Sequence, residues 1–148
     1  MLTEIRNLRE IAQRFLAGEA LDEDLSYWFG TSLQEFLERR ASTIEDAFGL
    51  RAPRGGLPWW MEDAIRLRDA ALRELAERFH GGRSVTGQAQ EIRRRALRYA
   101  ASAWRFDRDR AAMPPRYRGT QNECLWRAFK AGATMPLGER QLRKILAC

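Results

Sequence analysis

The longest helical pattern of apolar and polar positions runs from Ser84 to Arg110. At about 100° per residue, apolar side chains fill about half of the circumference of this segment. They are Val85, Ala89, Ile92, Ala96, Tyr99, Ala100 and Ala103, with Leu97, Trp104 and Phe106 on the flanks. The pattern predicts one long central helix that several neighbouring helices bury on one side.

Arginines occupy the opposite side of this segment. Arg94, Arg98 and Arg105 fall within roughly 40° of one another, and Arg95 and Arg108 flank them. At 1.5 Å per residue the three central arginines span about 16 Å, a length comparable to several phosphates along a nucleic-acid strand. The alternative is a solvated face that pairs with carboxylates such as Glu91 or with the acidic half of the chain.

Shorter helical patterns account for most of the remaining sequence. They predict helices at 3–17, 22–40, 44–48, 59–79, 121–131 and 137–147. The expected helix starts and stops are Thr3, Gly18, Ser42 or Thr43, Gly49, Ser84 or Thr86, Pro136 at N1 of the last helix, and a capping box of Thr120 with Glu123. Because no strand pattern appears, we predict an all-α fold, a single compact bundle of about six to seven helices.

The segment LRAPRGGLP at 50–58 is the clearest break in the pattern. It separates an acidic N-terminal helical unit at 1–49 from a basic helical unit at 59–148, within one domain, because two independent cores of this size would be marginal. Residues 1–63 hold 7 Arg and 12 acidic residues, a net charge of −5, whereas residues 64–148 hold 17 Arg, 2 Lys and 8 acidic residues, a net charge of +11. Such asymmetry is typical of a chain that meets a polyanion with one half.

Residue types that catalyse reactions or bind metals are sparse. His80 is the single histidine, and we expect it to end a helix. No spacing of metal ligands and no phosphate-binding loop motif is present, so we expect no enzyme activity, no metal and no cofactor. Cys124 fits a buried thiol, Cys148 an exposed one, and Asp107 and Asp109 fit intrahelical ion pairs.

Two short helical patterns at 121–131 and 137–147 resemble the outline of a helix-turn-helix. In that interpretation the second helix enters the major groove, where arginine reads guanine and glutamine reads adenine. Base edges would then be contacted by Arg140 and Gln141, and phosphates by Arg143, Lys144 and Arg127. An ordinary helical hairpin with a solvated basic face remains the alternative.

Apolar residues cluster where the central loop meets the next helix. Leu57, Trp59, Trp60 and Met61 form a candidate contact patch for a protein partner, because exposed tryptophan is typical of binding hot spots. The alternative is that the tryptophans hold this helix against the N-terminal helices.

These observations favour a non-enzymatic protein that binds nucleic acid, with duplex DNA as the leading partner. The second hypothesis is a protein-binding adaptor or inhibitor that acts through the tryptophan patch and charge complementarity, and the third is a homodimer that doubles the basic face. No apolar run reaches the length of a membrane span, and residues 1–16 lack the apolar core of a secretory signal, so we expect a cytoplasmic protein without membrane association.

Three phrases of the sequence carry a resemblance beyond composition. EDAFGL at 45–50, IRRRALRYAASAWR at 92–105 and MPLGERQLRKIL at 135–146 are similar to segments of a group of short, arginine-rich, all-helical bacterial proteins. The resemblance implies a bacterial setting and assigns no site residue.

Overall fold

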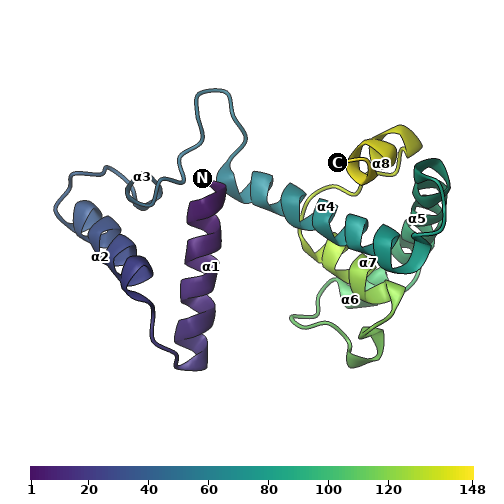
Figure 1. Cartoon of the computed structure of the whole chain (residues 1–148), viewed down its shortest axis with the longest axis horizontal. Coiled ribbons are helices and arrows are strands. Elements are labelled where there is room, and N and C mark those ends of the chain that lie inside the picture. The colour runs from purple at the N-terminus through teal and green to yellow at the C-terminus, as the bar shows by residue number, and fades with distance from the viewer. The chain divides into compact units, whose positions relative to one another are not determined.

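The computed structural model describes all 148 residues, which form eight α-helices, one short 3-10 helix and no strand (Figure 1). The all-α class is confirmed, with one helix more than the six or seven expected. Contacts divide the chain into an N-terminal unit, Met1–Asp63, and a C-terminal unit, Ala64–Cys148. The division falls within helix α4 (Trp59–His80). None of the helices combines the length and the apolar character that a membrane span requires.

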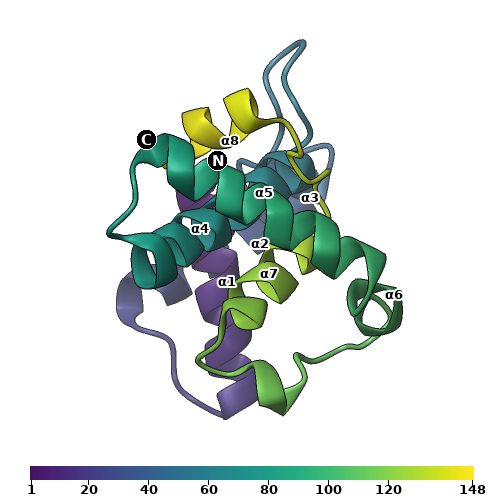
Figure 2. The same ribbon diagram turned by 90° about the vertical axis from the view of Figure 1, so that its right-hand side faces the viewer.

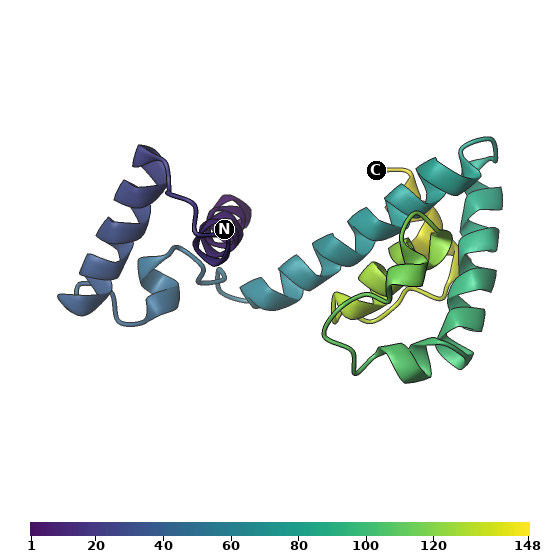
Figure 3. The ribbon, with the colours of Figure 1, turned by 90° about the horizontal axis from the view of Figure 1, so that it is seen from below.

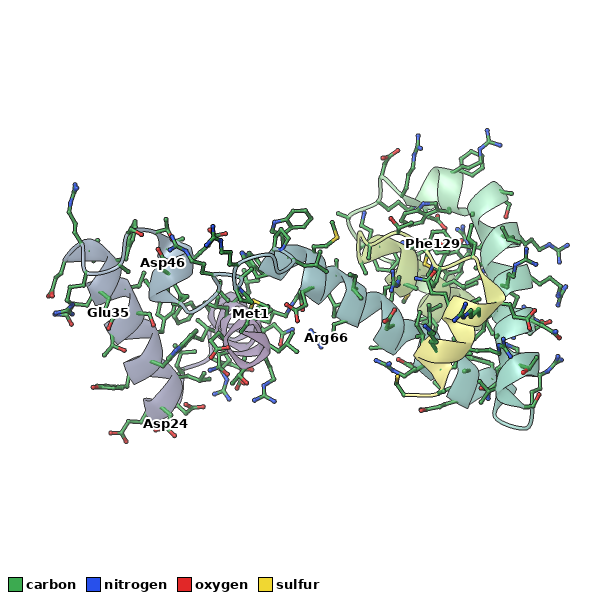
Figure 4. The ribbon with its side chains drawn as sticks, turned by 90° about the horizontal axis from the view of Figure 1, so that it is seen from above. Met1, Asp24, Glu35, Asp46, Arg66 and Phe129 are labelled. Atoms are coloured by element: carbon green, nitrogen blue, oxygen red, sulfur yellow. The ribbon has the colours of Figure 1, made fainter.

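The N-terminal unit contains α1 (Leu2–Ala17), α2 (Glu23–Leu37) and α3 (Ile44–Ala47), followed by the loop that leads into α4. Its buried apolar core is small and consists of Ile5, Ala47, Phe48 and Leu50. The rings of Trp28 and Phe29 pack on Phe48, with centroid distances of 5.4 and 5.6 Å. Acidic side chains such as Asp24, Glu35 and Asp46 lie on α2 and α3 (Figure 4).

The C-terminal unit contains the remainder of α4 with α5 (Val85–Ala101), α6 (Trp104–Asp107), the 3-10 helix η1 (Pro115–Tyr117), α7 (Gln121–Lys130) and α8 (Glu139–Leu146). Figure 3 shows α4, α5 and α7 around a common core, and Figure 2 shows α8 beside α5. The fully buried positions include Leu72 and Leu75 on α4, Ile92 on α5, Leu125 on α7 and Leu142 on α8. Phe129 contacts the rings of Tyr99 and Trp104 at the edge of this core (Figure 4).

Several predicted capping residues hold their helices as expected. Gly18 ends α1 with a φ of 70°, and Gly49 follows α3 with a φ of 69°. Thr43 accepts the N–H of Asp46, and Ser84 accepts the N–H of Gly87. These residues were chosen from local sequence alone because the capping contact spans only three residues.

Two other predicted helix starts are wrong, and a third has different cap contacts. Helix α1 begins at Leu2, so Thr3 lies inside the helix. Helix α7 begins at Gln121, directly after Thr120, as predicted, but the hydroxyl of Thr120 donates to the carbonyl of Tyr117 and Glu123 accepts the N–H of Gly119. Helix α8 begins at Glu139 rather than after Pro136, because the preceding segment is held in another conformation: Arg68 donates to the carbonyl of Thr134 and Arg93 to that of Leu137.

The predicted central helix at 84–110 ends earlier than expected. Helix α5 stops at Ala101, and Ser102 has φ −121° and ψ −98°, outside the helical region. The hydroxyl of Ser102 donates to the carbonyl of Arg98, a side-chain contact of the kind that bends helices. The next turn, α6, therefore starts with a new orientation, and the angles of a continuous helix do not apply to Arg105 and Phe106.

Candidate nucleic-acid interface

The arginine face of α5 is retained over Arg94 and Arg98. Both side chains are exposed, and nitrogen-tipped side chains extend from the outer side of α5 in Figure 4. Arg94 donates to Glu91 at 2.6 Å, and Arg95 donates to the same carboxylate at 2.8 Å. The hydrogen bond from Arg94, followed by that from Arg95, lowers the pKa of Glu91 to about 2. Arg98 forms no ion pair or side-chain hydrogen bond.

The predicted contact residues of α8 share its outer face. Leu142 and Ile145 point into the core, and the side chains on the other side are exposed and form no ion pair: Arg140, Gln141, Arg143 and Lys144. Helix α8 packs mainly against α5, whereas a helix-turn-helix packs its second helix against the preceding one, here α7. We use the name basic surface for the exposed cations on this packed pair of helices: Arg94, Arg98, Arg140, Arg143 and Lys144.

Arg105 and Arg108 lie on and just after α6, beyond the end of α5. Both are exposed, and Arg108 is 3.6 Å from Asp109. The break at Ser102 separates Arg105 from the helix that carries Arg94 and Arg98, so these three arginines do not form one continuous helical ridge.

The same break exchanges the expected roles of two neighbouring side chains. Phe106, which the pattern placed beside the core, is 78% exposed, whereas Asp107 is only 1% exposed. Asp107 accepts hydrogen bonds from the hydroxyls of Tyr117 at 2.6 Å and Tyr99 at 3.1 Å, and Arg110 lies 3.5 Å away. Burial and the hydrogen bonds to Asp107 raise the pKa of Tyr99 and of Tyr117 above the ordinary tyrosine value. Asp107 is thus an internal anchor for α6 in addition to the expected ion-pair partner of Arg110.

Not every arginine of the C-terminal unit is available to a ligand. Arg68, Arg73 and Arg93 donate to backbone carbonyls of the segment that contains α8. Arg127 pairs with Glu74 at 2.7 Å, and its bond, followed by that of Arg78, lowers the pKa of Glu74. The sequence alone does not separate the arginines that are bound within the protein from those that are available to a ligand, because that difference depends on tertiary contacts.

A small hollow of about 180 Å³ lies between α5 and α7. Guanidinium groups line it together with an amide from α7 and the C-terminal end of α5: Arg94, Arg95, Arg98, Tyr99, Ser102 and Asn122. The amide of Asn122 has no hydrogen-bond partner in the protein. The sequence contains no signal for this hollow, because its two sides are brought together only by the packing of α7 on α5.

The tryptophan patch is divided by the fold. Trp59 packs against the core of the N-terminal unit and donates to Glu45 at 3.0 Å. Trp60 is 54% exposed and Leu57 is 53% exposed, while Met61 is partly buried. The two exposed residues are therefore the part of this patch that faces solvent.

His80 and Cys124 are both buried in the C-terminal unit. His80 ends α4 as expected, but its ring nitrogen lies 3.0 Å from the side-chain oxygen of Gln121 rather than at the carbonyls of its own helix. Burial raises the pKa of the Cys124 thiol, as expected for a structural cysteine. Cys148 is exposed, and neither cysteine forms a disulfide.

Comparisons with protein-family models, with curated proteins and with solved structures find no match to the chain.

Proposed function

We propose that the C-terminal unit binds nucleic acid, with duplex DNA as the leading partner, and that it does so without catalysing a reaction. The observation that carries this proposal is the basic surface, in which four cations on α5 and α8 have no carboxylate partner: Arg98, Arg140, Arg143 and Lys144. The unit has a net charge of +11, so the electrostatic field of its other residues favours a polyanion as well.

The structure supports contacts to the phosphates of the nucleic acid more strongly than contacts to its base edges. Arg94 and Arg98 on α5 are four residues apart on one helical face, and so are Arg140 and Lys144 on α8. Each pair is therefore separated by about 6 Å along its helix axis, a spacing that suits contacts to successive phosphates. On a preferred sequence Arg140 and Gln141 at the start of α8 are the proposed readers of base edges, whereas on mixed sequence Arg140 contacts a phosphate. Because α8 rests on α5, we treat phosphate binding as the main source of affinity and base readout as secondary. The cytoplasm is the proposed location.

The test is binding of the full chain to a mixed-sequence fluorescent duplex, followed by anisotropy across a salt series. Five phosphate contacts, one for each cation of the basic surface, predict a slope of about −4.5 in a plot of log affinity against log salt. The double variant Arg140→Gln/Arg143→Gln should reduce the slope by about 2. The matched control Arg6→Gln/Arg54→Gln removes two exposed cations of the N-terminal unit and should leave the slope unchanged. Equal slopes for the two variants would contradict the proposal.

A protein-binding function is the second candidate, and the exposure of Leu57 and Trp60 favours it. In this case the variant Trp60→Ser should lose a protein partner that the wild-type chain retains in a pull-down. The neighbouring Trp59 is unsuitable for the test because its ring belongs to the N-terminal core. Sedimentation of the purified chain measures whether the partner is a second copy.

A further inference from the structure

Three arginines line the hollow between α5 and α7, and two of them pair with a carboxylate of α5. Arg94 and Arg95 share Glu91, and Arg98 has no partner. Since the pKa of Glu91 is about 2, its carboxylate is charged throughout the neutral range. The three arginines and Glu91 therefore leave the hollow with a net charge of +2.

This charge distinguishes two kinds of phosphate. A phosphate monoester carries about −1.5 to −2 at pH 7, whereas a phosphodiester within a strand carries a single negative charge. The net charge of the hollow therefore matches the monoester. Arg98 and the amide of Asn122 are the donors that hold no other partner, and Arg94 can turn one of its N–H groups from Glu91 to the ligand.

The size of the hollow points to the same group. Pockets that enclose drug-sized molecules measure about 300 to 1,000 Å³, and this hollow of about 180 Å³ lies below that range. Its volume suits a phosphate group rather than a whole nucleotide. A terminal phosphate offers three free oxygens to the donors of the hollow, whereas a phosphodiester offers two.

We propose that this hollow binds a terminal phosphate of a nucleic-acid strand, tested below with the 5′-phosphate, an inference that rests on the proposed function. The neighbouring cations of the basic surface favour a polyanion over an isolated phosphate group, because they can neutralise the phosphates that follow the end. The site gives the protein a preference for phosphorylated ends over continuous backbone.

The experiment compares two duplexes of the same sequence, labelled at a 3′ end, one with 5′-phosphates and one with 5′-hydroxyls. We expect the full chain to bind the phosphorylated duplex about tenfold more tightly, since the added group makes charge-assisted hydrogen bonds. Arg98→Gln and Asn122→Ala should each bring this ratio close to 1. The control Arg140→Gln/Arg143→Gln should weaken both duplexes by the same factor and leave the ratio near its wild-type value.

The outcomes separate this inference from the proposal on which it rests. Equal affinities for the two duplexes, with a steep salt slope for both, would overturn the terminal-phosphate site and leave nucleic-acid binding in place. No binding of either duplex at low salt would overturn both. A phosphoserine peptide that binds more tightly than either duplex would overturn the assignment to nucleic acid.

Discussion

At the scale of single residues, Glu91 balances the charge of the hollow and holds two of its arginines in place. Glu91→Gln should strengthen binding of the phosphorylated duplex severalfold, because Arg94 and Arg95 are then released for the ligand. The same variant should lower the free energy of unfolding by about 0.5 kcal/mol at pH 7. The control is Glu77→Gln, which removes an exposed carboxylate from α4 and should alter neither the affinity for the duplex nor the free energy of unfolding.

The pH dependence of this effect has a definite sign. The folded-state pKa of Glu91 is lowered to about 2 from an ordinary 4.5, so its stabilising contribution is complete above pH 4.5. It decreases as the pH falls from 4.5 towards 2. Urea denaturation should therefore show a difference between wild type and Glu91→Gln at pH 7 that disappears near pH 2. A difference of equal size at both values would contradict the assigned ion pairs.

Asp107 is the buried charge on which the turn after α5 depends. Asp107→Ala should lower the free energy of unfolding by about 3 kcal/mol, because the hydroxyls of Tyr99 and Tyr117 then lose their acceptor inside the protein. Asp109→Ala removes a carboxylate that is 86% exposed and should change the free energy of unfolding by less than about 0.5 kcal/mol. Urea denaturation of the two variants measures their free energies of unfolding, and similar values would show that Asp107 is not an anchor.

Residues 106 and 107 also show where sequence reasoning fails at this scale. A continuous helix would place Phe106 near the core and Asp107 on the surface, and the structure has the reverse. The residues from Ala101 to Trp104 are all compatible with a helix, so the sequence contains no signal for the break at Ser102. Asp107 is the anchor because two tyrosines, eight residues before it and ten residues after it, fold back to supply the hydrogen bonds.

At the scale of elements, the position of α8 depends on its contact with α5. Leu142 is fully buried in the core, so Leu142→Ala should destabilise the C-terminal unit by about 3 kcal/mol and increase amide exchange in α8. Leu137→Ala, at an exposed leucine of the preceding segment, should have little effect. Faster exchange in α7 than in α8 for the Leu142 variant would contradict this packing.

Most helices could be predicted, and their packing partners could not. The periodicity of apolar residues locates all of the longer helices, and Ser84 and Thr43 mark starts correctly because caps are local. The start of α8 was missed since Arg68 and Arg93 bind the carbonyls before it from distant parts of the chain. The predicted ridge includes Arg105 because the sequence has no signal for the break at Ser102, and the hollow beside Asn122 is not predicted because it depends on the packing of α7 on α5.

At the scale of the whole chain, the two units differ in the size of their cores. Four residues form the buried apolar core of the N-terminal unit, whereas fourteen form that of the C-terminal unit. Apolar burial is the main source of stability. Amides of α1 and α2 should therefore exchange with solvent faster than the amides of α5 and of the part of α4 that follows residue 64. Uniform protection across both units would contradict this ranking.

The loop between α3 and α4 offers a practical way to work with this chain. Residues 53–58 are all exposed, and the N–H of Gly56 donates to the carbonyl of Pro53 in a turn that requires the positive φ of Gly55, 80°. Exposed loop tips of this kind tolerate nicking and insertion. Trypsin can therefore cleave after Arg54 without unwinding a helix, and a fluorescent label or an affinity tag can be inserted there away from both cores.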